Sequence, residues 1–303
     1  MHAHRAFVVL AAIVASSAPV VLAGCSSSPA RAGYENPPEP TTEEAPTAPE
    51  PEPTGAFNPD KPTPPETNPH EINEVYGHSS DTLFTLDPKT KAVAEVGKFD
   101  GCQPVTDIAL DENSKLYAST SKTLYTVDKA TAKCTEIAQG SYPNSLSFVP
   151  KGTVDPNAEA LVGYEDANYV RIDPTTGAKS IIGALGGGLR SSGDIVSVKG
   201  GKTYLTVKGT GTTCVTNDCL VEVDPATGKM LKNWGSIEHH NVFGLSFWGG
   251  KVYGFSDTGE LFEVTFGASQ LATNPIPIPN APSKLSFWGA GSSTSAPLVE
   301  PTK

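Results

Sequence analysis

The chain has 303 residues and a formal net charge of −11, with 38% hydrophobic and 18% charged residues. An acidic chain lacks the basic face that nucleic-acid binding requires, so no nucleic-acid partner is expected. The length is sufficient for one domain with a sizeable core, and sharp changes of composition predict further segments before it.

The first 24 residues have the pattern of a secretory signal peptide. A basic start, MHAHR, precedes an apolar run over residues 6–23, and small residues follow at its end. This order is typical of exported proteins. The run is also just long enough to cross a bilayer, but Ser16, Ser17 and Pro19 weaken a permanent span. Residues 1–24 are therefore expected to be removed during export.

The signal segment ends in Leu22-Ala23-Gly24-Cys25, which resembles the lipobox of bacterial lipoproteins. The resemblance implies cleavage before Cys25 and attachment of acyl chains, palmitate among them, to this residue. The protein would then be anchored in a membrane of the cell envelope and face the periplasm or the cell exterior, because each buried methylene contributes about 0.8 kcal/mol. Cleavage without lipid, which releases a free protein, is the alternative.

Residues 25–70 are expected to form a disordered tether. From residue 35 onward, Pro, Glu and Thr dominate, and large apolar residues are nearly absent. Such a composition cannot bury enough surface to offset the entropy of ordering. Its prolines favour extended polyproline II structure, which suits a stalk that holds a domain away from a membrane. A ligand for a proline-reading partner is the other use of such a segment.

Five cysteines are present, and they favour an oxidising compartment. Without Cys25, four remain, and an even set in an exported chain predicts two disulfides. Cys214 and Cys219 lie at the ends of one short loop, which leaves Cys102 for Cys134. A metal site is the alternative, but no C-x-x-C pair supports it.

A short motif recurs through the rest of the chain. It reads LFTLDPKTKAV from Leu83, LYTVDKATAKC from Leu124, YVRIDPTTGAK from Tyr169 and LVEVDPATGKM from Leu220, with a degenerate copy, LFEVTFGASQL, from Leu261. Strand-like pieces rich in Val, Ile, Leu, Thr, Tyr and Phe precede the copies. These pieces predict antiparallel meanders rather than helices. A repeat of about forty residues with four strands is typical of a β-propeller blade.

Residues 71–289 are therefore expected to form an all-β domain, a five-bladed β-propeller of four-stranded antiparallel blades. The first blade lacks its innermost strand, and the C-terminal strand is expected to supply it, by pairing of Lys284–Trp288 with Glu74–Tyr76. Closure of the ring removes exposed sheet edges. Residues 290–303 are left as a disordered tail.

The repeats are similar to the L-Y-x-[IV]-D-P-x-T-G repeats of bacterial extracytoplasmic lipoproteins with a β-propeller domain, of the WD40 and quinoprotein-like superfamily. The resemblance covers the whole domain. It implies the architecture but no particular activity, because propellers host many functions. It also implies that a binding site lies where loops converge on the central channel, on the face opposite the D-P-x-T-G turns.

The aspartates of the motif are expected to have a structural role; they are Asp87, Asp128, Asp173 and Asp224. The chain must reverse after each of them. An Asp side chain can accept a backbone N–H bond in such a turn, Pro presets φ, and Gly adopts a positive φ. The alternative is a rim of carboxylates that binds cations. The degenerate copy contains TFGAS without an Asp, and it must still turn.

Alignment of the innermost strands places one residue per blade at the channel: Asp107, Ser145, Asp194, Gly244 and Lys284. These side chains could bind a polar ligand or a cation such as Ca²⁺, with Asp107 and Asp194 as the candidate metal ligands. Alternatively, Lys284 pairs with an aspartate and plugs the channel, because buried charges must be paired. Further ligand-binding candidates on neighbouring loops are Arg190, His239 and His240.

Two functions fit these features. The first is a lipid-anchored module that binds an envelope protein, a glycan or a small ligand. It is favoured because the sequence contains no G-x-S-x-G, no H-E-x-x-H and no Walker loop. The alternative is a metal-dependent hydrolase, lactonase-like or phosphoesterase, with a site at the channel mouth. No cofactor is predicted apart from the Ca²⁺ already named.

Overall fold

The computed structural model describes residues 74–209, 214–279 and 281–302. The signal peptide, Cys25, the Pro-rich tether and residues 71–73 lie outside these ranges. All regular elements within the ranges are β-strands. No helix in this part of the chain is long and apolar enough to cross a membrane.

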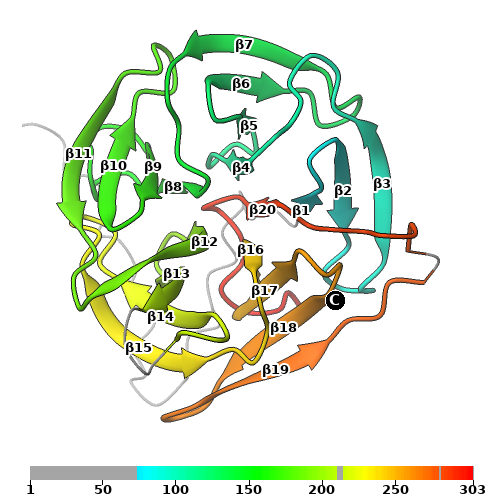
Figure 1. Ribbon diagram of the computed structural model, residues 1–303, viewed down its shortest axis with the longest axis vertical. Helices are drawn as coiled ribbons and strands as arrows, with labels where there is room; N and C mark the ends of the chain where they lie inside the picture. Colours follow the sequence, from blue (N-terminus) through cyan, green and yellow to red (C-terminus); the bar gives the residue numbers. More distant parts are fainter. Residues whose placement is uncertain (1–73, 210–213, 280, 303) are drawn as a thin grey trace, which may run out of the picture. The chain divides into compact units, whose positions relative to one another are not determined.

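The strands form five four-stranded antiparallel sheets around a common axis (Figure 1). From the channel outward, the first blade contains β20 (Gly289–Ser292), β1 (Val75–His78), β2 (Thr82–Leu86) and β3 (Val93–Lys98). The second contains β4 (Asp107–Leu110), β5 (Leu116–Ser119), β6 (Thr123–Val127) and β7 (Cys134–Gln139). The third contains β8 (Leu146–Val149), β9 (Ala160–Glu165), β10 (Asn168–Ile172) and β11 (Lys179–Ala184).

The last two blades follow the same order. The fourth contains β12 (Leu189–Ser197), β13 (Thr203–Gly209), β14 (Cys219–Val223) and β15 (Met230–Ser236). The fifth contains β16 (Val242–Trp248), β17 (Lys251–Ser256), β18 (Leu261–Phe266) and β19 (Leu271–Pro275). The predicted five-bladed, all-β propeller is confirmed.

Burial explains why strands of one blade differ in composition. The innermost strands β4 and β8 are buried at every residue, since each lies between neighbouring blades. The outermost strands β3 and β7 are partly exposed. The apolar core lies between adjacent blades, where Tyr164 and Tyr169 of the third blade pack with Leu205 of the fourth. Burial of apolar area, at about 25 cal/mol per Å², therefore holds each blade to its neighbours.

The repeated motif forms the turn between the third and fourth strands of a blade. In the third blade, Asp173 Oδ1 accepts the N–H groups of Thr175 and Thr176 over 2.8 and 2.9 Å. The same capping bond is made by Asp87, Asp128 and Asp224. The fourth residue after each Asp adopts a left-handed conformation; these residues are Lys91, Ala132, Gly177 and Gly228. The structural role predicted for the aspartates is confirmed.

The turn of the fourth blade also packs against the third blade. The Tyr164 hydroxyl donates to Gly228 O over 2.5 Å, and the Tyr169 hydroxyl donates to Pro225 O over 2.8 Å. A side chain at Gly228 would place its Cβ 2.3 Å from Cγ of Tyr169. The glycine is therefore required both by its positive φ and by the close approach of the tyrosine ring.

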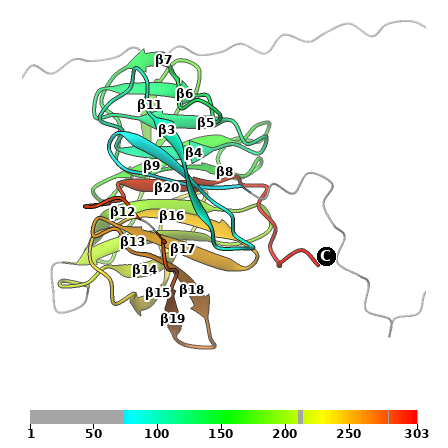
Figure 2. The same cartoon turned by 90° about the vertical axis from the view of Figure 1, so that its right-hand side faces the viewer.

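The ring closes through β20 and β1, with Val75 opposite Ser292 and His78 opposite Gly289. Seen from the side, β20 lies in the middle of the ring (Figure 2). The expected pairing of Lys284–Trp288 with Glu74–Tyr76 is wrong, because residues 282–288 are used to cross from the fifth blade to the first. In this crossing, the Phe287 ring packs edge-on against Phe84 and Phe255.

The expectation of a disordered tail over residues 290–303 is also wrong, since residues 290 and 292–296 are buried. The Ser293 hydroxyl donates to Asp111 O, and Thr294 O and Pro297 O accept the N–H groups of Lys199 and Gly249. This segment therefore runs along turns of three blades. Small and polar residues of this kind are typical of a disordered segment, but the turns provide hydrogen-bond partners for its backbone.

Both predicted disulfides are present. Cys102 pairs with Cys134, which ties the connection between the first two blades to the outer strand β7. Cys214 pairs with Cys219 and closes the loop that precedes β14.

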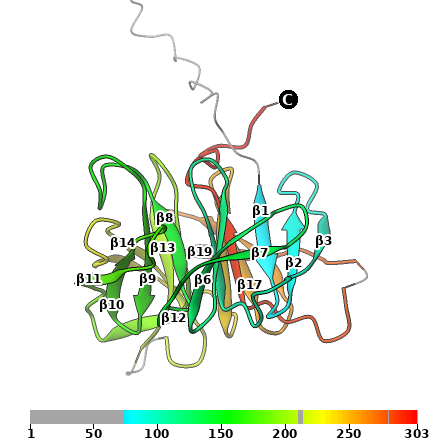
Figure 3. The ribbon, with the colours of Figure 1, turned by 90° about the horizontal axis from the view of Figure 1, so that it is seen from above.

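The two ends of the channel differ. The inner strands begin at the end that carries the connections between blades, here called the loop end, and finish at the end that carries the D-P-x-T-G turns, the turn end. β1 runs in the opposite direction, so Val75 and Ser292 lie together at the turn end. The start of β1 and the C-terminus consequently lie on the same side of the domain (Figure 3). Neither end of the described domain lies at the loop end.

Candidate functional site

The five inner strands bring one residue each to the loop end of the channel. Asp107, Ser145 and Asp194 lie there and are fully buried. Gly244 occupies the equivalent position in the fifth blade. In the first blade the position belongs to Gly289 rather than Lys284, because Gly289 begins β20.

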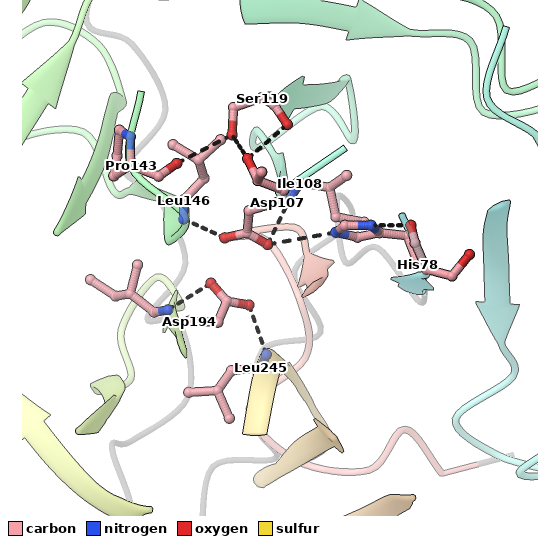
Figure 4. Close-up of polar contacts among 11 residues, drawn as sticks. His78, Asp107, Ile108, Ser119, Pro143, Leu146, Asp194 and Leu245 are labelled. Atoms are coloured by element: carbon pink, nitrogen blue, oxygen red, sulfur yellow. Dashed lines mark hydrogen bonds and ion pairs between the residues drawn. The ribbon is translucent and has the colours of Figure 1, made fainter. Parts of the chain in front are cut away.

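The carboxylates of Asp107 and Asp194, here called the carboxylate hub, accept one backbone amide from each of the five inner strands. Figure 4 shows the bonds from Ile108, Leu146 and Leu245. Asp107 accepts the N–H groups of Ile108 and Leu146 over 2.9 and 2.6 Å. Asp194 accepts those of Ile195 and Leu245 over 2.6 and 2.7 Å, together with that of Ala290. A buried N–H without a partner destabilises the fold. The hub provides hydrogen-bond acceptors for the N–H groups that closure of the ring buries.

The hub holds a shared proton. Burial raises the pKa of both carboxyl groups well above the usual range, and the charge of Asp194 raises the pKa of Asp107 further. The two groups also share a side-chain hydrogen bond. A proton between them removes the repulsion that two buried anions would feel.

His78, the last residue of β1, is a site residue that the sequence did not reveal. It is fully buried, its Nδ1 lies 2.8 Å from Ser79 O, and its Nε2 lies 3.9 Å from Asp107 Oδ1 (Figure 4). Burial lowers its pKa to about 4, so the ring is neutral at physiological pH. A neutral ring that donates from Nδ1 to Ser79 O carries its lone pair on Nε2, toward Asp107. Only the pairing of β1 with β20 brings this ring to the channel.

The third channel side chain, Ser145, is bound within its own blade. Its hydroxyl accepts the Tyr164 N–H over 2.8 Å. Among the described residues, no three His, Cys, Asp or Glu side chains converge as a metal site. Each oxygen atom of the hub already accepts a backbone amide, which uses part of its capacity as a ligand for a divalent cation.

The other predicted site residues are spread over the loop end. Lys284 is exposed, so it neither reaches the channel nor pairs with the aspartates. Arg190 is exposed at the start of β12. His239 stacks on Phe262 with ring centroids 3.8 Å apart. His240 points elsewhere, with Nδ1 3.0 Å from Thr216 O. These residues do not form one site with the hub.

A polar cavity of about 360 Å³ opens at the loop end of the first blade. One wall is the loop Ser79–Thr82 between β1 and β2, and the other is the crossing segment that contains Lys284 and Trp288. The Trp288 N–H donates to His78 O over 2.8 Å, which fixes the crossing segment beside the first blade. The cavity thus lies over the joint that closes the ring.

Neither a protein-family model nor a curated protein matches the chain. Solved structures resemble it in fold. A hydrazine synthase of Kuenenia stuttgartiensis matches with 14% identity and a TM-score of 0.39, over 70% of this chain and 65% of that one, less than two thirds of its length. A chain of a nidogen/laminin complex matches with 11% identity and a TM-score of 0.46, over 72% and 97%. A gluconolactonase of Xanthomonas campestris matches with 14% identity and a TM-score of 0.43, over 70% and 76%. Likeness at this level transfers no activity, and no family is assigned.

Proposed function

We propose that the protein is a lipid-anchored binding module of the cell envelope, displayed on its Pro-rich tether. One observation supports a binding role over catalysis at the channel. The hub carboxylates accept the amides of all five inner strands and share a proton. These groups therefore serve to close the ring. The surface loops at the loop end are the proposed binding surface for an envelope protein, a glycan or a small ligand.

The anchoring part of the proposal rests on Leu22-Ala23-Gly24-Cys25 after an apolar run. The two disulfides suit an oxidising compartment and so support export. The described domain begins and ends at the turn end. The loop end is opposite the residue at which the domain joins the preceding chain, and it is the surface that we propose for binding.

Fractionation of cells that express the full chain tests the anchor. The wild type is expected in the membrane fraction and Cys25→Ser in the soluble fraction, with Ser28→Ala as a control that keeps the lipid site. Membrane-bound Cys25→Ser would refute lipid anchoring. Metabolic labelling with palmitate provides a second readout, because only the wild type and the control should be labelled.

The second candidate function is a metal-dependent hydrolase at the channel. His78 Nε2 favours it, because this buried atom has no hydrogen-bond partner among the described residues and lies 3.9 Å from Asp107 Oδ1. Imidazole nitrogen and carboxylate oxygen are ligands for zinc. Elemental analysis of the purified protein, with melting curves in Zn²⁺, in Ca²⁺ and after chelation, separates the candidates. A stoichiometric metal that Asp107→Asn and Asp194→Asn both lose would favour the hydrolase.

A further inference from the structure

The cavity at the loop end of the first blade joins two parts of the chain that are far apart in sequence. Ser79, Ser80, Asp81 and Thr82 line one side, and residues 282–286 with Trp288 line the other. Its volume of about 360 Å³ lies within the range of small-molecule sites, about 300–1,000 Å³. A ligand in this cavity would contact both sides of the ring-closing joint at once.

Trp288 provides the aromatic surface of the cavity. Its side chain is 39% exposed, and it is the only aromatic residue among the strongly exposed large hydrophobic side chains of the described residues. Its backbone N–H is held by His78 O over 2.8 Å, so the position of the residue does not depend on its indole ring. An exposed ring on a fixed backbone can stack on a ligand with little loss of conformational entropy.

Asp81 provides a fixed hydrogen-bond acceptor. Its Oδ1 accepts the hydroxyl groups of Ser79 and Thr82, each over 2.9 Å, and its Oδ2 lies 3.2 Å from Lys98 Nζ. Hydrogen bonds from the Ser79 and Thr82 hydroxyls lower the pKa of this carboxyl below its usual value, and Lys98 lowers it by a smaller amount. Asp81 therefore remains ionised at physiological pH. Ionised acceptors make hydrogen bonds about twice as strong as neutral ones.

The charges around the cavity select a neutral ligand. Two acids, Asp81 and Glu95, face two lysines, Lys98 and Lys284, so neither sign of charge predominates in the lining. Phosphate binding would call for an excess of basic groups, and a simple cation would call for an excess of acidic ones. The remaining lining groups that can bind a ligand are mainly serine hydroxyls at positions 79, 80, 283 and 286. These groups pair with a ligand that carries many hydroxyls.

We propose that this cavity binds a neutral saccharide, whose apolar C–H face stacks on Trp288 and whose hydroxyl groups bond to Asp81 and the serines. A pyranose ring has both an apolar face and a polar edge, which matches a cavity with one aromatic wall and one hydrogen-bonding wall. The proposal rests on the binding function proposed above and names its ligand class. Because the sugar bridges the first blade and the crossing segment, its binding raises the stability of the closed ring.

Titration of the full chain tests the proposal, in a detergent that has no sugar headgroup. The probes are glucose, galactose, N-acetylglucosamine and cellobiose, with alanyl-alanine and inorganic phosphate as charged probes. At least one saccharide should raise the melting temperature saturably and change the tryptophan fluorescence. Trp288→Ala should weaken this binding about tenfold, and Asp81→Asn should weaken it similarly.

A control variant separates stacking and hydrogen bonding from other effects. Leu231→Ala removes a side chain that is 61% exposed on the outer strand β15 and should leave binding unchanged. The proposal is overturned if no saccharide binds, if only the charged probes bind, or if Trp288→Ala binds with unchanged affinity. The membrane fractionation of Cys25→Ser does not involve the cavity, so anchoring can stand when saccharide binding fails.

Discussion

The geometry of the carboxylate hub predicts unequal losses of stability for the substitutions Asp107→Asn and Asp194→Asn. Asp194 accepts three backbone N–H groups, those of Ile195, Leu245 and Ala290. Asp107 accepts two, those of Ile108 and Leu146. Replacement by Asn preserves size and removes one oxygen acceptor. We therefore expect Asp194→Asn to destabilise the fold about twice as much as Asp107→Asn.

The magnitudes follow from the number of donors left without a partner. An asparagine at position 107 has one oxygen for two N–H donors and loses one accepted N–H. A buried donor without a partner costs about 1–3 kcal/mol. An asparagine at position 194 has one oxygen for three N–H donors and loses two accepted N–H groups, and its own amide group faces N–H groups. Two lost bonds, which were charge-assisted, correspond to about 3–6 kcal/mol.

Urea unfolding at pH 7 in the presence of a chelator measures the difference, with Asp100→Asn as a control at an exposed acid. The expected order of midpoints is wild type and control, then Asp107→Asn, then Asp194→Asn. Equal loss in the two hub variants would refute the reasoning from the number of accepted amides. A wild type that loses stability on chelation, down to the level of both variants, would show instead that a cation binds the carboxylates.

Two further predictions concern the turn end. Burial raises the pKa of Glu159 from 4.5 to about 7, although hydrogen bonds from the Thr294 hydroxyl and the Glu112 N–H lower it. The folded state therefore keeps a proton that the unfolded state releases, so this contribution to stability is complete below pH 4.5 and is lost as the pH rises through 7. Glu159→Gln should flatten that part of a pH series of urea midpoints, and an unchanged slope would contradict it. Gly228→Ala should lower the free energy of unfolding by about 2–4 kcal/mol, because the residue has a φ of 68° and its new Cβ would clash with Tyr169. Ala132→Gly, at the equivalent position of the second blade, should change it by no more than about 1 kcal/mol. Equal shifts of the melting temperature in the two variants would refute this reasoning.

The architecture was predictable because each blade repeats the same local signals. The D-P-x-T-G turn marks the passage from the third to the fourth strand, and its Asp caps the same backbone groups in every blade that retains it. The order of strands then follows from antiparallel pairing of neighbours. Both disulfide pairs were predictable as well, because the short loop from Cys214 to Cys219 leaves one choice for the other two cysteines.

The closing strand could not be located in the same way. The segment SKLSFWG resembles GLSFWGG of the fifth blade, so similarity of sequence placed the strand at Lys284–Trp288. The structure uses Phe287 as a side chain that packs between blades and builds the strand from Gly289–Ser292. Four small residues have little β-propensity of their own. The position of the closing strand is determined by its pairing with β1 and by the space at the centre of the ring. Both exist only in the assembled ring.

The hub itself depends on groups that have no sequence signature. Four of the five aligned channel positions, Asp107, Ser145, Asp194 and Gly244, were identified, because strand starts align in sequence. The five amides that converge on the carboxylates belong to the backbone, and any residue supplies them. His78 was missed because it ends the second strand of a blade, and the alignment considered only the starts of the first strands.

The aligned channel positions hold two aspartates, one serine and two glycines, and the space at the centre explains this set. A Cβ at Gly289 would lie 2.3 Å from Asp107 Oδ1 and from His78 Nε2, and a Cβ at Gly244 would lie 2.7 Å from the Cβ of Ala290. Side chains at all five positions would therefore collide. The two glycines leave room for two carboxylates, and the two carboxylates serve the amides of blades that have no acceptor of their own. Variation at this repeat position is consequently a packing requirement of a five-bladed ring, and differences in ligand preference have to be sought in the loops that surround it.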